Sequence, residues 1–486
     1  MHSTEAKVRF DVVPAYQVPS GWMLIGKDVG PHGRQVLAVE RSATGLRVVC
    51  SGSAHEVFDD APYRDTGYQF SADGWHVSYV AVRGSGWYVV RDGEAYGPYE
   101  GLSRQIRPTW SPKGDHLVFA AVIDGVMRLV MDGRPESSHG VSAVPPAFSA
   151  DGEHLAYVAN DGPQHHWVVV DGVAGPACED FPKGKEGSLA LSADGSHVLY
   201  VAHRGGRANV YMDHSPGPPI DGWQYLTLGP NGRYAYTGHR GRKAFGVIDG
   251  EITPSYDVVG EFTYSVDGRL AYLVEEHRKK LFGFDRKVSV VLDGQVGAPH
   301  QLVWAAVRFS PDGRHLAYLA KDEDGARLYF DGNPQGRFDE VRFAPHFSPT
   351  GDRIAFCART GKAWHVVCDR TPGPAFDETS PPIFASDGRL GYIGKAKGKE
   401  AVVIDHQAGP SFDQIGISSY THRPELFASR SNYVGYVGRS GNQFAPVVDS
   451  EAGPTFEGLG PPDLDLVSGV AFWGGRGNTF FKVIAG

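Results

Sequence analysis

The chain has 486 residues, of which 47 are basic and 56 acidic, and its net charge is -9. A chain of this length exceeds a single ordinary core, so several domains or a stacked repeat are expected. The acidic balance argues against a nucleic-acid partner. No stretch approaches the ~20 apolar residues that span a bilayer, and the polar segment Met1–Arg9 lacks the apolar core of a signal peptide. We therefore expect a cytoplasmic protein with no membrane partner.

The first elements predicted along the chain are two short strands, Lys7–Phe10 and Tyr16–Val18. A first repeat unit follows, with its turn at Val29–Gly33. From there a phrase built on Phe-Ser-x-Asp-Gly returns about every 40 residues, a period typical of repeat architectures. The phrase starts at Phe70, Trp110, Phe148, Leu191, Leu228, Tyr264, Phe309, Phe347, Phe384 and Phe427.

The unit that starts at Phe309 shows the predicted strands most clearly. Ser310-Pro311-Asp312-Gly313 has the residue order of a type I turn. The strands around it are predicted at Val307–Phe309, His315–Ala320, Leu328–Phe330 and Arg337–Val341. Four short, hairpin-connected strands per repeat make one blade of a β-propeller.

The repeats predict an all-β fold, a β-propeller of about twelve four-stranded blades. The C-terminal segment Phe472–Val483 aligns with Phe309–Ala320 as the first two strands of a last blade. Residues 1–20 would complete that blade with its third and fourth strands. Because propellers usually have four to eight blades, we expect two tandem six-bladed rings, divided into residues 1–258 and 259–486. One large ring is the alternative.

The phrase Phe309–Tyr318, Phe-Ser-Pro-Asp-Gly-Arg-His-Leu-Ala-Tyr, resembles the WD-like repeats of TolB and of prolyl-oligopeptidase-type propeller domains. The resemblance covers nearly the whole chain, and it implies a propeller rather than an activity. In the peptidases the chemistry resides in a separate hydrolase domain, and this sequence has no Gly-x-Ser-x-Gly nucleophile motif. We therefore expect no peptidase activity.

The turns predict which face of the propeller functions. The first-to-second and third-to-fourth turns are uniform along the chain and define a uniform-turn face. The second-to-third hairpins and the crossovers between blades vary, and they define a variable-loop face. Because recognition usually resides in variable loops on a rigid scaffold, we expect a non-enzymatic scaffold that binds another protein through the variable-loop face.

Basic and aromatic side chains on the variable-loop face are the candidate partner-binding residues, and they suit an acidic protein. The alternative is that basic hairpin tips only protect sheet edges. Trp223, Tyr225 and Trp304 are expected to pack between blades instead. The candidates are Arg204, Arg207, Arg240, Arg242, Lys243, Arg278, Lys279 and Lys280 at hairpin tips, and Tyr63, Arg64, Arg104, Arg107, Tyr420, His422 and Arg423 in crossovers.

Neither the histidines nor the cysteines indicate a cofactor, a metal site or a catalytic residue. One histidine per blade recurs after the Asp-Gly turn, which predicts a structural role: His76, His116, His154, His197 and His315. The four cysteines show no metal-ligand spacing and are expected to be buried thiols. An acid also recurs after an aromatic residue, at Asp339, Asp377, Asp413 and Glu457. Such acids leave an alternative, a propeller enzyme or a binder of a carbohydrate-like ligand in the central channel.

Overall fold

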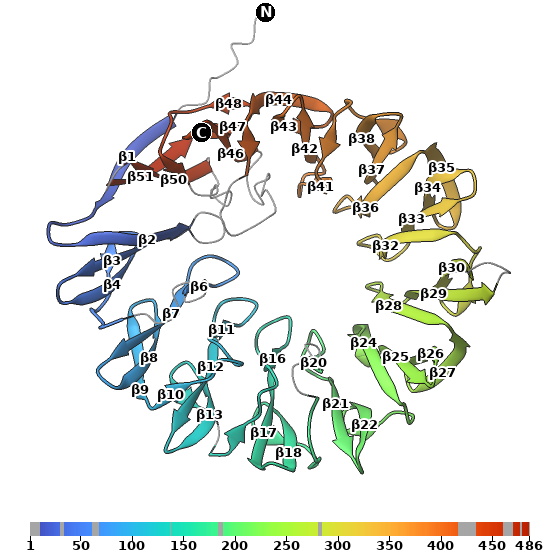
Figure 1. Ribbon diagram of the computed structural model, residues 1–486, viewed down its shortest axis with the longest axis horizontal. Coiled ribbons are helices and arrows are strands. Elements are labelled where there is room, and N and C mark those ends of the chain that lie inside the picture. Colours follow the sequence, from blue (N-terminus) through green and yellow to red (C-terminus); the bar gives the residue numbers. More distant parts are fainter. Residues whose placement is uncertain are drawn as a thin grey trace, which may run out of the picture. The chain divides into compact units, whose positions relative to one another are not determined.

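The computed structural model describes residues 10–29, 34–60, 68–136, 138–182, 188–279, 284–416, 434–459, 470–476 and 479–485. Within these ranges the regular structure is β-strand apart from one short 3-10 turn, η2 (Pro230–Gly232), and no helix is long and apolar enough to cross a membrane. The strands form twelve antiparallel sheets of four or five strands (Figure 1). The fold is therefore an all-β propeller with twelve blades, as predicted.

The blades follow one another along the chain. In order they are β2–β5 (residues 23–54), β6–β9 (68–99), β10–β14 (101–135), β15–β19 (140–174), β20–β23 (189–216), β24–β27 (222–256), β28–β31 (258–296), β32–β35 (302–338), β36–β39 (340–372), β40–β44 (378–412), β45–β48 (414–452), and β49–β51 (458–485) with β1. Three of them have five strand segments, because the first strand is interrupted between β10 and β11, β15 and β16, and β40 and β41.

The eighth blade shows the common plan. Its strands are β32 (Leu302–Phe309), β33 (Leu316–Asp322), β34 (Gly325–Phe330) and β35 (Asn333–Phe338). Each pairs antiparallel with the next, and Tyr318 lies opposite Tyr329. Apolar residues fill β33 because the sheet is covered on both faces by neighbouring sheets, which favours a continuous apolar run over strict alternation.

Side-chain hydrogen bonds stabilise the turn between the first two strands. The Ser310 hydroxyl donates to Asp312 Oδ1 at 2.5 Å, and its oxygen accepts the His315 amide at 2.9 Å. Asp312 also accepts the Arg314 amide at 3.1 Å. These donors lower the pKa of Asp312. The same serine–aspartate pair recurs at Ser71 and Asp73, Ser149 and Asp151, Ser192 and Asp194, and Ser265 and Asp267.

The turn between the third and fourth strands requires a left-handed backbone. Asp331 has φ 48° and Gly332 has φ 75°, the type I′ geometry that matches the twist of a hairpin. Aspartate tolerates this region because its side chain bonds locally. The Asp331 carboxylate accepts the Leu316 amide at 2.9 Å and so joins the turn to the second strand.

The last blade is shared between the two ends of the chain, as predicted, but the division of its strands differs. Its sheet order is β1 (Phe10–Gln17), β51 (Thr479–Ala485), β50 (Val470–Arg476), β49 (Gly458–Leu459). The N-terminal part therefore supplies one strand rather than two. The alignment of Phe472 with Phe309 was wrong, because Phe472 lies on the second strand of its blade and Phe309 on the first.

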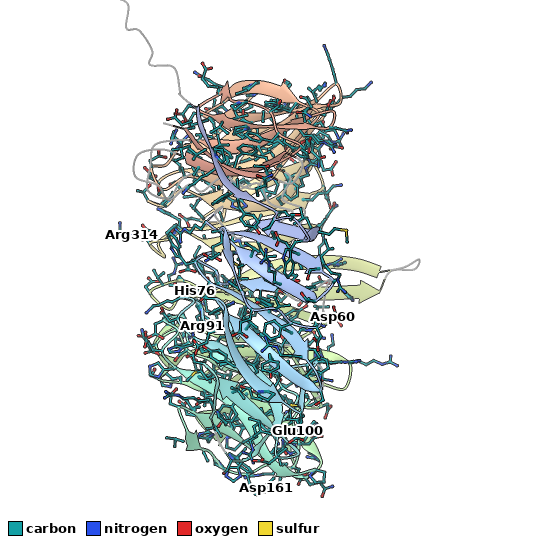
Figure 2. All side chains as sticks on the ribbon, turned by 90° about the vertical axis from the view of Figure 1, so that its left-hand side faces the viewer. Asp60, His76, Arg91, Glu100, Asp161 and Arg314 are labelled. Atoms are coloured by element: carbon teal, nitrogen blue, oxygen red, sulfur yellow. The ribbon has the colours of Figure 1, made fainter. Side chains whose placement is uncertain are left out.

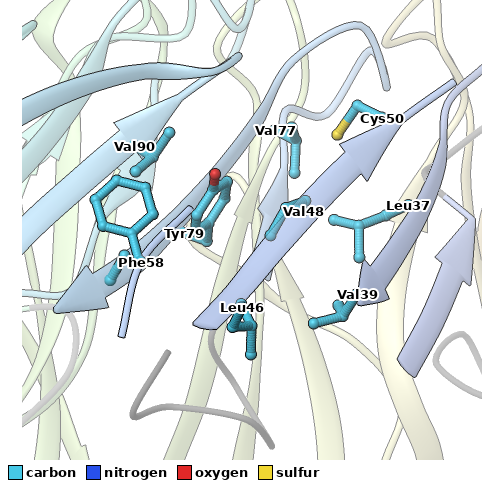
Figure 3. Packing of buried hydrophobic residues seen from close by; sticks show 10 residues of the cluster. Leu37, Val39, Leu46, Val48, Cys50, Phe58, Val77, Tyr79 and Val90 are labelled. Carbon is cyan, nitrogen blue, oxygen red and sulfur yellow. The ribbon is translucent and has the colours of Figure 1, made fainter. Parts of the chain in front are cut away.

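The cores lie between neighbouring sheets. In Figure 3, Leu37 and Val48 of the first blade and Tyr79 and Val90 of the second belong to one buried cluster. Cys50 belongs to the same cluster, and burial raises the pKa of its thiol to about 12. Cys357 and Cys368 are also buried, Cys178 is half-buried, and all four are free thiols, as expected.

Contacts divide the chain into two compact units. One comprises Met1–Gly101, Ala363–Val366 and Gly373–Gly486, and the other Leu102–Lys362 and Val367–Pro372. In the second unit the strands β16, β20, β24, β28, β32 and β36 lie on the concave side of an arc (Figure 1). The predicted boundary between residues 258 and 259, and the grouping of the blades into rings, stay predictions.

Candidate functional site

The recurring histidines of the uniform-turn face are bound within their own blades. His315 Nδ1 lies 2.7 Å from the Asp331 carboxylate, whose other oxygen accepts the Leu316 amide. The same 2.7 Å pair joins His76 to Asp92, His116 to Asp132, His154 to Asp171 and His197 to Asp213. Arg233, Arg269 and Arg353 replace the histidine in other blades. These side chains connect the second strand to the third-to-fourth turn, which is a structural role.

The recurring acids of the crossovers are also bound within their blades. Asp339, Asp377 and Asp413 accept the backbone amides of Gly361, Lys397 and Gly441 at 2.6, 2.9 and 2.7 Å. Each amide lies at the tip of a second-to-third hairpin, so the carboxylate fixes that tip against the crossover. Lys399 and the Gly441 amide together lower the pKa of Asp413. Glu457 follows Phe456 at the equivalent position. Within the described chain, no three His, Cys, Asp or Glu side chains gather as a metal site.

The two faces are distinct in space. In the first unit, the turn residues His76 and Arg91 lie on one side and the crossover residue Asp60 on the other (Figure 2). Crossovers and second-to-third hairpins therefore share one face, as the strand order requires.

Two neighbouring hairpin tips carry five of the predicted basic residues. One tip joins β21 (Val198–Arg204) to β22 (Arg207–Met212), and the next joins β25 (Tyr234–Arg240) to β26 (Lys243–Ile248). Their sheets pack through one buried cluster that includes Val201 and Phe245. The tips are therefore adjacent, and we call the five residues Arg204, Arg207, Arg240, Arg242 and Lys243 the basic tips.

Three of the basic tips have partners inside the chain. Arg204 donates to the Ala177 carbonyl at 2.8 Å, and the Arg240 guanidinium lies 5.4 Å from the centroid of Phe245. Lys243 pairs with Asp257 at 2.7 Å. By contrast, Arg207 and Arg242 are exposed, and neither guanidinium forms an ion pair with any residue that the structure describes. Of the five basic tips, these two are the most available to a partner.

The nearby acids are held by backbone amides. Glu179 accepts from Gly205 at 2.7 Å and Gly206 at 3.1 Å, which lowers its pKa. Asp221 accepts from Gly241 at 2.9 Å. These carboxylates support the tips that present Arg207 and Arg242.

The remaining predicted residues lie on other blades or outside the described residues. Arg278 and Lys279 end β29 (Leu270–Lys279), on the next blade. Arg104 and Arg107 are exposed between β10 (Gly101–Leu102) and β11 (Thr109–Trp110), on the third blade. Lys280, Tyr63, Arg64, Tyr420, His422 and Arg423 lie outside the described residues.

The first strands of two blades carry exposed aromatic residues that the sequence did not predict correctly. One was expected to be buried, and the other was not predicted at all. Trp223 packs in the core as expected, at 8% exposure, but Tyr225 is 41% exposed and so does not pack between blades. Phe343, 38% exposed, was not predicted. Both have a left-handed backbone, with φ 52° and 62°. The signal that distinguishes them is the register of the first strand, which the repeat phrase does not include.

No protein-family profile matches the chain, and no curated protein matches it either. Among solved structures, it is similar to a eukaryotic initiation factor, at 13% identity over 77% of this chain and 94% of that one, with a TM-score of 0.38. It is similar to TolB from Acinetobacter baumannii, at 15% identity over 62% and 79%, with a TM-score of 0.23. A third similarity is to the β-propeller domain of the Trilobed protease from Pyrococcus furiosus, at 14% identity over 55% and 95%, with a TM-score of 0.27. The twelve sheets confirm the propeller fold that the TolB-like resemblance predicted.

Proposed function

We propose that this propeller is a non-enzymatic, cytoplasmic scaffold that binds an acidic segment of another protein through its variable-loop face. The observation that carries the proposal is the pair of adjacent tips, where Arg207 and Arg242 are exposed and without ion pairs among the described residues. Arginine forms bidentate hydrogen bonds with carboxylates and is frequent at the centre of interfaces.

The surroundings favour binding over support of the fold. The turns of the uniform-turn face use their serine, histidine and aspartate side chains within each blade. At the basic tips, Arg204 and Lys243 are likewise engaged, and they fix the hairpins that carry the two available arginines. A rigid tip loses little entropy when a partner binds, which favours affinity.

The test is capture of a partner from native lysate with the intact chain, with R207E/R242E and with a control. The control variant, K113E/R314E, reverses the same charge on two exposed turns of the uniform-turn face. We expect a stoichiometric protein that is retained by the control and lost from R207E/R242E. Equal capture by both variants would exclude the basic tips as the binding surface.

The dependence on salt gives a second readout. Binding through exposed arginines weakens as salt is raised, since the Debye length shrinks from about 10 Å at 0.1 M to 3 Å at 1 M. We expect the captured protein to dissociate as salt increases over this range. A complex that persists at 1 M salt would indicate an apolar interface elsewhere on the propeller.

A further inference from the structure

Four neighbouring first strands of the second unit share an irregularity. They are β24 (Gly222–Leu228), β28 (Val258–Tyr264), β32 and β36 (Glu340–Phe347). Each lies beside the next, on the concave side of this unit (Figure 1). In every one the pairing with the second strand shifts at a bulge, between Gln224 and Thr227, Val259 and Phe262, Trp304 and Arg308, and Arg342 and His346. Bulges re-aim side chains and are frequent next to functional sites.

One position of these bulges forms a row across the four strands. Near its start, each of these strands has one buried residue that marks the equivalent position in the four blades. These residues are Trp223, Val259, Val303 and Val341. The position that forms the row lies two residues after each of them. The residues at that position, which we call the bulge row, are Tyr225, Glu261, Ala305 and Phe343. Aromatic residues thus stand at the two ends of the row, and an exposed carboxylate lies between them.

The two aromatic residues are held in a costly arrangement. Tyr225 and Phe343 have positive φ, which is a genuine outlier for bulky residues, and both are more than a third exposed. Exposure forfeits burial of the ring, and the left-handed backbone adds strain, so neither feature stabilises the fold. Residues held in such conformations cluster at ligand-binding sites. Arg342 lies 5.0 Å from the Phe343 centroid and supports that ring from one side.

Exposed polar groups on the same strands indicate the chemistry of a ligand. Gln224 and Glu261 are exposed on the same strands, and they offer an amide and a carboxylate. Arg308, also exposed, adds a positive charge that balances Glu261. The half-buried Arg342 lies against the Phe343 ring. Aromatic faces that stack on C–H surfaces, with neutral and oppositely charged hydrogen-bonding groups around them, fit a polyhydroxylated, uncharged molecule.

We propose that the bulge row is a binding site for a neutral oligosaccharide, with sugar faces stacked on Tyr225 and Phe343 and hydroxyls donating to Glu261. Three inter-strand steps separate the two aromatic residues. Even at the spacing of hydrogen-bonded strands, about 4.8 Å, three steps exceed one sugar ring. The ligand is therefore an oligomer. The site is independent of the basic tips, so either proposal can fail without the other.

Glycine substitutions test the site without damaging the fold. Glycine adopts positive φ at no steric cost, so Y225G and F343G remove a ring and relieve the backbone at once. Their melting temperatures should equal or exceed that of the parent chain. Trp75, which is 55% exposed in a turn of another blade, provides the matched control W75A.

The experiment is calorimetric titration of the full chain with cello-, manno-, malto-, chito- and laminari-hexaose at millimolar concentrations. We expect saturable binding of at least one, weakened about three- to tenfold by each glycine substitution and lost in Y225G/F343G. W75A should bind like the parent. A folded chain that binds none of the five overturns the proposal, as does undiminished binding by the double variant. Binding of an octaproline peptide in place of every sugar would overturn the ligand class.

Discussion

Asp331 performs three tasks in its blade, and substitutions separate them. The carboxylate accepts the Leu316 amide at 2.9 Å and pairs with His315 at 2.7 Å. The Asp331 backbone occupies a left-handed turn position. Asp331→Asn keeps an acceptor for the amide and tolerates positive φ. Asp331→Gly loses both bonds but accepts the turn geometry. Asp331→Ala loses both bonds and strains the backbone.

The expected magnitudes follow from these tasks. An amide left without its acceptor costs about 1–3 kcal/mol, and alanine in the left-handed region costs roughly 1–2 kcal/mol more. The exposed pair with His315 contributes at most about 1 kcal/mol. We therefore expect the loss of stability to rank Ala above Gly above Asn, with Asp331→Ala near 3 kcal/mol, about a hundredfold in local opening.

Hydrogen exchange of the peptide that covers residues 314–332 measures this opening within the blade. The matched control is Asp324→Ala, because Asp324 lies at the other end of the same blade and its carboxylate, which is 55% exposed, pairs with Arg327 rather than with a backbone amide of the second strand. This control should change exchange by less than about fivefold. Equal exchange in Asp331→Ala and Asp331→Asn would refute the assignment of the cost to the Leu316 amide and the turn.

Two further outcomes are expected. The Ser310 hydroxyl keeps the pKa of Asp312 below its ordinary value, so this carboxylate stabilises the fold above its unfolded pKa and the stability is lost as pH falls through the folded pKa. Ser310→Ala should therefore raise the pH midpoint of acid unfolding, followed by circular dichroism, and an unchanged midpoint would contradict this linkage. In the last blade, a Cβ on Gly474 would lie 2.5 Å from the buried Phe456 ring, so Gly474→Ala should cost about 1–3 kcal/mol. Thermal unfolding should show a lower midpoint for this variant but not for Gly162→Ala, which meets open space.

The blade could be predicted from sequence because its turns repeat. Ser310, Asp312 and Asp331 recur with fixed chemistry, since their hydrogen bonds define the backbone geometry of each turn. The last blade was harder to divide, because Phe472-Trp473-Gly474-Gly475 resembles a first strand and turn but continues as β50. Gly474 in that strand makes room for the Phe456 ring rather than for a turn.

The candidate site was only partly accessible to sequence reasoning. The sequence shows that a hairpin contains a lysine or an arginine, but it does not show the partner of that side chain. Lys243 and Arg242 therefore look equivalent in the sequence, whereas in the structure Lys243 pairs with Asp257. Asp339 and Asp413 looked like candidates for channel chemistry because the sequence does not show their hydrogen-bond partners. Each carboxylate accepts a backbone amide from a hairpin tip that lies more than 20 residues later in the sequence. The exposure of Tyr225 depends on a one-residue shift of register, which side-chain patterns do not reveal.

The shared last blade also has a consequence for the order of events during synthesis. β1 begins at Phe10, and its only ladder within the described chain pairs it with β51, which ends at Ala485. Most blades complete their sheets from residues close together in sequence, so they can form as they emerge. β1 must wait, unpaired, until nearly every other strand has been made. A strand that waits is open to pairing with another chain, and contacts between such distant segments form slowly. We therefore expect misassembly between newly made copies to occur mainly at this sheet. A circular permutant, in which a short linker joins β51 to β1 and the new termini lie in another loop, should remove the delay.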